Sequence, residues 1–161
     1  MRGFRDATRM RALAAVTAIA MLVCGCASTH RETTSFLLER AYARRDPPAT
    51  DHDWQVVAFA RSQVGKPYCW GGIGPSCFDC SGLVKEAWAT VGVRLPHSAK
   101  AIPETVVEIP LSEVRPGDIL WWPQHLALYA GNGWSIEALN RREGVVARPA
   151  RDPERAFRPP G

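Results

Sequence analysis

Short apolar runs separated by turn residues fill the second half of the chain after Pro116-Gly117. They cover residues 119–122, 126–130 and 134–138, and a fourth apolar stretch lies at 144–147. Runs of about five residues are typical of strands and too brief for ordinary helices. Because turn residues connect them so closely, neighbouring strands have to run antiparallel. This half of the chain therefore predicts an antiparallel β-sheet.

Two helical patterns precede the predicted sheet. Apolar residues recur at helical spacing from Asp53, which can cap the helix start, until Gly65 and Pro67 stop the pattern. A second pattern covers residues 83–91, with Asp79 near its start and Gly92 at its end. Helices first and an antiparallel sheet afterwards predict an α+β fold, with a helical layer packed on the sheet.

The first residues of the chain indicate export and a lipid anchor. Four arginines precede an apolar run at residues 12–23, which is shorter than the ~20 residues of a membrane-spanning helix. The Val23-Cys24-Gly25-Cys26 sequence resembles a bacterial lipobox, which implies a signal peptide over residues 1–25 and acylation of Cys26. Ser28, rather than Asp, favours sorting to the outer membrane, facing the periplasm. An exported protein can also form disulfides.

The remaining organisation follows from length and charge. The 161 residues suffice for one domain with appendages. We expect a polar tether at 26–50, the folded domain at 51–147 and a loosely held tail rich in proline and arginine at 148–161. The net charge of +4 resides mostly in the leader, because residues 26–161 hold 16 basic and 15 acidic residues. A nucleic-acid partner is therefore not expected.

Cys80 is the strongest candidate for chemistry. It lies at the start of the second helix, where free amide groups and the helix dipole favour the thiolate, the nucleophilic form of the side chain. The alternative is a buried structural cysteine.

A thiolate nucleophile needs a base, and the chain has four histidines: His30, His52, His97 and His125. The first two lie in or beside the tether, and His97 has no evident acid or thiol partner in the sequence, so we interpret it as lining a loop or groove. If residues 131–133 close a three-residue hairpin loop, Ala127 opposes Glu137, which then lies diagonally beside His125. Glu137 can orient the imidazole in this register, whereas a slip of one residue would turn the carboxylate away.

Five sequence blocks, in order and spacing, resemble the NlpC-type family of papain-like cell-wall peptidases. The blocks are Gly65-Lys66-Pro67-Tyr68-Cys69-Trp70-Gly71-Gly72, Phe78-Asp79-Cys80-Ser81-Gly82-Leu83-Val84, Leu95-Pro96-His97-Ser98, Arg115-Pro116-Gly117-Asp118-Ile119 and His125-Leu126-Ala127-Leu128-Tyr129-Ala130-Gly131-Asn132-Gly133. The similarity covers roughly residues 54–147, most of the predicted domain.

The resemblance implies a papain-like α+β fold and a thiol mechanism. Cys80 is then the nucleophile and His125 the base and acid. Glu137 is the residue that orients His125, and the family most often has a histidine at the position of Glu137. Tyr68, Asp79 and Ser81 are expected to position the substrate or the oxyanion. The substrate implied is the peptidoglycan stem peptide, cut next to diaminopimelate by a D,L-endopeptidase, with no cofactor or metal. Ile102 replaces a glutamine that many members carry.

Cys69 and Cys77 stand where the family commonly has other residues. A disulfide between them is the first possibility, and it would brace the loop that carries Tyr68. The second possibility is a zinc site that also uses Cys80 and His97 or His125, and the third is a pair of reduced, buried thiols.

The main hypothesis is thus a lipid-anchored, monomeric cysteine peptidase of the cell wall. The rivals are a non-catalytic scaffold lipoprotein that binds peptidoglycan, and an amidase or acyltransferase that uses the same thiolate.

Overall fold

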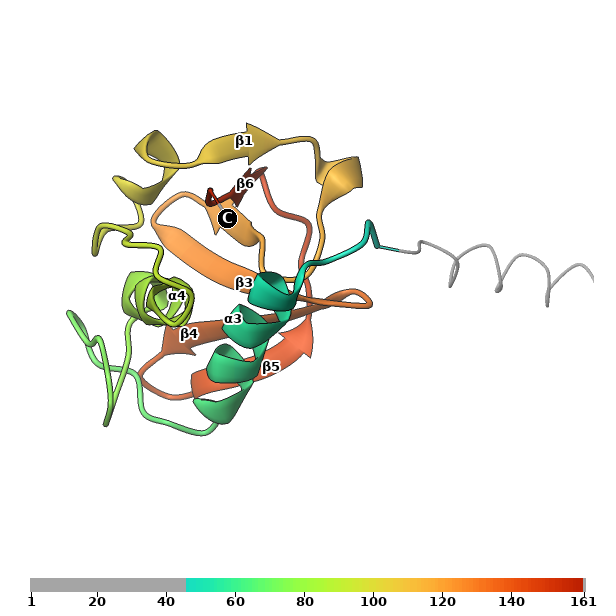
Figure 1. The fold of residues 1–161 in the computed structure, drawn as a ribbon. Coiled ribbons are helices and arrows are strands. Elements are labelled where there is room, and N and C mark those ends of the chain that lie inside the picture. Colours follow the sequence, from blue (N-terminus) through green and yellow to red (C-terminus); the bar gives the residue numbers. More distant parts are fainter. Residues whose placement is uncertain (1–45, 161) are drawn as a thin grey trace, which may run out of the picture. The chain divides into compact units, whose positions relative to one another are not determined.

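The computed structural model describes residues 46–160, and this part of the chain has the predicted α+β architecture (Figure 1). The helices are α3 (Asp51–Ser62) and α4 (Cys80–Ala89), with 3-10 turns η1 (Ile102–Glu104) and η2 (Leu111–Glu113). The strands are β1 (Val107–Ile109), β2 (Ile119–Trp122), β3 (His125–Gly131), β4 (Trp134–Asn140), β5 (Gly144–Pro149) and β6 (Arg155–Arg158).

Helix α3 begins two residues before Asp53, because Thr50 and Asp53 form a reciprocal cap. The Thr50 hydroxyl accepts the Asp53 amide at 3.2 Å, and the Asp53 carboxylate accepts the Thr50 amide at 2.7 Å. Asp53 is therefore the third helical residue rather than the cap itself. The prediction that Asp53 helps to cap this helix is confirmed, but the prediction that the helix begins at Asp53 was wrong.

The strands form one antiparallel sheet in the order β1-β6-β2-β3-β4-β5. In the β3–β4 hairpin, Leu128 faces Ile136 and Tyr129 faces Ser135. These two pairs have the register of the predicted hairpin, in which Ala127 opposes Glu137. The loop differs from the prediction, since Gly131 rather than Ala130 faces Trp134 across a bulge. Asn132 and Gly133 both have positive φ, as a two-residue Asn-Gly turn requires.

Helices α3 and α4 pack on the sheet, and α4 contacts both β3 and β4 (Figure 1). The core between them consists of apolar side chains from both helices and the central strands. Its largest fully buried members are Trp88, Phe78, Phe157, Leu83, Ile102, Ile119, Leu126, Leu128 and Ile136. The nucleophile candidate thus lies on a helix that is fixed along its length by core packing.

The expectation of a loose tail after residue 147 was wrong. Strand β6 lies inside the sheet, where it pairs with β1 on one side and β2 on the other. Phe157 is fully buried, and Arg158 makes two hydrogen bonds of 2.8 Å to the buried Asp118 carboxylate. Phe157, with Arg155 and Arg158 in ion pairs, is enough to stabilise this strand, although a composition rich in proline and arginine predicts a solvated segment.

The folded unit also begins before residue 51. Asp46 accepts hydrogen bonds of 2.7 Å from the Tyr129 hydroxyl and the Asn132 amide, so the end of the expected tether contacts the β3–β4 hairpin. The predicted signal peptide, Cys26 and the rest of the tether lie outside the described residues.

Candidate active site

Cys80 is the first residue of α4, and Asp79 caps that helix. One Asp79 oxygen accepts the Gly82 amide at 2.7 Å and the Ser81 hydroxyl at 3.0 Å, while the other accepts the Gly71 amide at 2.9 Å. Asp79 and Ser81 therefore hold the helix start and the preceding loop in place around Cys80. Cys80 is 9% exposed and is a free thiol.

His125 and Glu137 lie side by side on strands β3 and β4, as the predicted register requires. His125 Nε2 is 2.5 Å from Glu137 Oε2. Glu137 occupies Nε2, and Cys80 lies close enough to His125 for the negative charge of its thiolate to act on the imidazole. The structure therefore brings together a thiol, an imidazole and a carboxylate, an arrangement that is suited to covalent acyl transfer.

Glu137 is a buried carboxylate with cationic neighbours. It is 1% exposed, and Arg151 Nη2 lies 3.3 Å from Oε2 while Arg148 Nε lies 3.9 Å from Oε1. The Arg151 guanidinium also stacks over Trp122 at 4.6 Å, and the Trp122 ring contacts the His125 ring at a centroid distance of 5.9 Å. Arg148 near the end of β5 and Arg151 just after it thus cover one side of His125 and Glu137. The sequence did not indicate this contact.

The pKa values of the pair follow from these contacts. Burial lowers the pKa of His125, but hydrogen bonds and negative charge from Cys80 and Glu137 outweigh it and raise this pKa to about 9. Burial raises the pKa of Glu137, but the hydrogen bond and charge of His125, with Arg151 and Arg148, bring it below the usual value. Both effects favour an imidazolium beside a carboxylate near neutral pH.

Tyr68 lies close enough to Cys80 for their charges to interact. Burial raises the pKa of the Tyr68 hydroxyl, and the negative charges of Cys80 and Asp79 raise it further, against an opposing effect of Arg141. Tyr68 therefore remains protonated and can donate a hydrogen bond to an oxyanion. A bridge between residues 68 and 78 holds this tyrosine beside the segment that leads into α4.

His97 has a partner that the sequence did not reveal. Its Nε2 lies 2.9 Å from both oxygens of Asp79, the residue that caps the nucleophile helix. His97 does lie in a loop, as interpreted, but the loop places it against an acidic partner. The two residues are 18 positions apart, and only the fold brings them together, so no local pattern could have shown the contact.

Cys69 and Cys77 form a disulfide in the structure. It closes residues 69–77 into a loop that begins directly after Tyr68. The segments on either side of this loop are also joined, because the Cys69 amide donates to the Phe78 carbonyl at 3.0 Å and the Phe78 amide donates to the Pro67 carbonyl at 3.1 Å. The disulfide uses both thiols on which the zinc alternative depended. Within residues 46–160, no cluster of three or more His, Cys, Asp or Glu side chains is placed to hold a metal ion.

Replacing both Cys69 and Cys77 with serine is expected to lower the free energy of unfolding by about 2–3 kcal/mol, the chain-entropy value for so short a loop. Peptide cleavage should fall as well, because Tyr68 loses its support. Urea unfolding of the wild type with and without reductant measures the stability effect, and the variant should not respond to reductant. A variant as stable and active as the oxidised wild type would contradict a bracing role.

Gly82 is expected to tolerate no side chain. A Cβ at this position would overlap the Gly72 carbonyl oxygen, which accepts the Asp79 amide at 2.9 Å. Gly82→Ala should therefore push the glycine-rich loop away from α4 and cost about 1–3 kcal/mol of stability. Thermal unfolding can be compared with Lys85→Ala, a partly exposed site on the same helix. Equal melting temperatures for both variants would refute the close approach.

The comparison with protein families identifies the domain. The NlpC/P60 family model matches residues 65–155, more than half of the chain. A protein named probable endopeptidase from Mycobacterium tuberculosis is 42% identical over 86 residues, which are 52% of this chain and 22% of that protein. The chain thus matches only about a fifth of that relative's length.

Solved structures agree with this assignment. The peptidoglycan hydrolase RipB from Mycobacterium tuberculosis has a TM-score of 0.61 and 35% identity, over 66% of this chain and 64% of that one. Two structures of the resuscitation promoting factor interacting protein RipA are also similar, one mutated at a histidine and one at a glutamate. Their TM-scores are 0.62 and 0.63, and both are 33% identical over 66% of this chain and 61% of the RipA chain. These neighbours confirm the expected papain-like α+β fold, and the chain belongs to the NlpC/P60 family.

Proposed function

We propose that this chain is a cell-wall hydrolase that cleaves peptidoglycan stem peptides through an acyl-enzyme on Cys80. The observation that carries the proposal is the contact of His125 with the buried Glu137 carboxylate, at a place where the charge of Cys80 also acts on the imidazole. The RipA structures support the choice of Glu137, because their changed histidine and glutamate are 12 residues apart, the separation of His125 and Glu137. The name of RipB, a peptidoglycan hydrolase, supports the substrate class.

In the first step, the Cys80 thiolate attacks the carbonyl carbon of the scissile peptide bond. A carbon–sulfur bond forms, and the carbonyl electrons move to the oxygen, which the Tyr68 hydroxyl and the Cys80 amide can stabilise. The His125 imidazolium then donates its proton to the leaving amine as the carbon–nitrogen bond breaks. The products of this step are a free amine and a thioester on Cys80.

In the second step, water hydrolyses the thioester. The neutral His125 takes a proton from the water, whose oxygen attacks the thioester carbonyl. The Cys80 thiolate leaves, the imidazolium is regenerated, and the new carboxylic acid gives its proton to the solvent as it is released as a carboxylate. Glu137 stabilises the imidazolium in both steps by its negative charge.

The bond cut is proposed to lie next to diaminopimelate, as in a D,L-endopeptidase. Incubation of the purified full chain with defined peptidoglycan fragments, followed by mass spectrometry, tests both the reaction and the bond. New amine and carboxylate termini at that bond are the expected products. Binding without turnover would support a scaffold instead, and loss of an amide nitrogen or transfer to an acceptor would indicate an amidase or acyltransferase.

We also propose that Cys26 carries the lipid that holds the protein at the outer membrane. The sequence of residues 1–28 is the basis, and none of these residues is described structurally. In residues 46–160, no helix is both long enough and apolar enough to cross a membrane. Metabolic labelling with a palmitate analogue should mark the wild type in the outer-membrane fraction and not Cys26→Ser, and labelling of both would reject Cys26 as the acceptor.

A further inference from the structure

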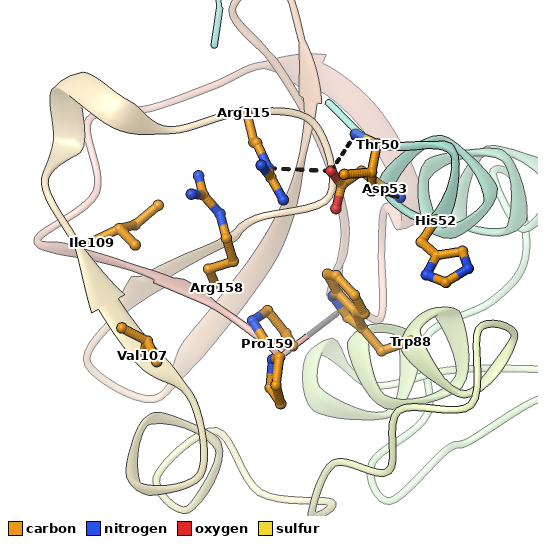
Figure 2. Close-up of a pocket in the computed structure, with 10 residues that line it drawn as sticks. Thr50, His52, Asp53, Trp88, Val107, Ile109, Arg115, Arg158 and Pro159 are labelled. Carbon is orange, nitrogen blue, oxygen red and sulfur yellow. Dashed lines mark hydrogen bonds and ion pairs between the residues drawn. The ribbon is translucent and has the colours of Figure 1, made fainter. Parts of the chain in front are cut away.

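We propose that the pocket between α3, α4, β1 and β6 is a second ligand site, which binds a small molecule with a carboxylate and an apolar body. The pocket has a volume of about 390 Å³, a size suited to a small ligand, and Figure 2 shows side chains from all four elements around it. It lies apart from the candidate active site. Trp88, in its wall, comes eight positions after Cys80 on α4, about 12 Å along the helix axis.

The wall of the pocket contains a buried hydrogen-bond donor without an acceptor. Trp88 is 1% exposed, and within the described residues its Nε1–H has no hydrogen-bond partner. A second donor on the same pocket, Arg115 Nε, is also buried without a hydrogen bond, although its charge pairs with Asp53 at 3.2 Å (Figure 2). Buried donors are normally satisfied, so the Trp88 Nε1–H indicates a missing acceptor, whereas Arg115 Nε already has the Asp53 carboxylate beside it.

The wall of the pocket has more cationic than anionic side chains. Arg115 and Arg158 line the pocket, against the single carboxylate of Asp53. The Asp118 carboxylate, which is fully buried, holds Arg158 through its Nε and one terminal nitrogen. Within residues 46–160, the hydrogen bonds of Arg158 leave its other terminal nitrogen as a donor. A fixed guanidinium is well suited to bind an oxyanion.

The pocket also has a surface for the apolar part of the ligand. The rest of the wall has the polar residues Thr50 and His52 but no further carboxylate, and its aromatic and aliphatic surface comes from Trp88, Val107, Ile109, Pro159 and Pro160. A simple inorganic anion would leave that surface in contact with water. A carboxylate joined to a ring or short alkyl group satisfies the donors and covers the apolar wall together.

Phenylacetate is the probe for this site, and the neutral phenylacetamide is its matched control. The full chain is prepared with ¹⁵N-labelled tryptophan in a non-ionic detergent, and Trp88→Phe identifies the Trp88 indole resonance. Phenylacetate should shift this resonance saturably and bind about tenfold tighter than phenylacetamide, because hydrogen bonds to a charged acceptor are stronger. Absence of a saturable shift overturns the proposal, and equal binding of the two probes overturns the carboxylate class.

A pair of variants at the rim gives a test that does not disturb the core. Val107 is 64% exposed, so Val107→Glu and Val107→Gln should both fold. Calorimetric titration should show phenylacetate binding about fivefold weaker to the glutamate variant than to the glutamine variant, because like charges repel. Cys80→Ala should bind as the wild type does. Equal affinity of the two rim variants, or loss of binding in Cys80→Ala, would place the probe elsewhere.

Discussion

Replacing Cys80 with alanine is expected to reduce cleavage of peptidoglycan fragments by about 10⁴-fold or more, the effect of removing a nucleophile. The variant should fold normally, since Cys80 lies at the first turn of α4 and the core contacts of that helix are made by larger side chains. The measurement is the initial rate of product formation, by chromatography and mass spectrometry, under conditions in which the disulfide is retained.

Cys80 and His125 act together in the proposed mechanism, so the double variant at these positions is a control for Cys80→Ala. His125→Ala should also cause a large loss, and the double variant should be no worse than Cys80→Ala, because residues that act as a unit are not additive. Ser62→Ala, on the exposed side of α3, should behave as the wild type. Iodoacetamide should alkylate Cys80 more slowly in His125→Ala than in the wild type. The alkylation is followed by mass spectrometry of the peptide that contains Cys80. Retained cleavage by Cys80→Ala would reject the acyl-enzyme.

The arrangement of His125 and Glu137 was predictable because it depends on local pairing. The Asn132-Gly133 turn forces the two strands into a hairpin, and the alternation of side chains then decides which residues share a face. The bulge between Tyr129 and Gly131 alters only the end of the hairpin next to the turn. The pairs from Tyr129 inward keep the register on which the prediction rested.

The parts that the sequence did not reveal depend on contacts between distant segments. Strand β6 is stable because β1 and β2 enclose it and Asp118 pairs with Arg158, 40 residues away. The contacts of Arg151 with Glu137 likewise require the chain to return across the sheet after β5. Composition alone describes this segment as proline- and arginine-rich, and tertiary packing overrides that description.

Replacing Glu137 with glutamine is expected to lower kcat/KM about 100-fold at neutral pH and to move its alkaline limit to lower pH. Glutamine keeps the shape and an oxygen that can accept the His125 hydrogen bond, but it removes the negative charge. That charge helps to raise the pKa of His125 to about 9, so its loss lowers this pKa. The imidazolium that must protonate the leaving amine is then lost at a lower pH.

The pH profile separates this role from a purely structural one. The wild type should lose activity as the pH rises through about 9, where His125 deprotonates, and Glu137→Gln should lose it earlier. Glu143→Gln is the matched control, since it removes a carboxylate from the exposed β4–β5 turn. Its profile should equal that of the wild type. Because Arg148 and Arg151 are 40% and 45% exposed, water can solvate them when Glu137 is neutral, and the variant should remain folded. A lower rate with an unchanged alkaline limit would mean that Glu137 positions His125 without setting its charge, and the imidazolium role proposed for Glu137 would then be wrong.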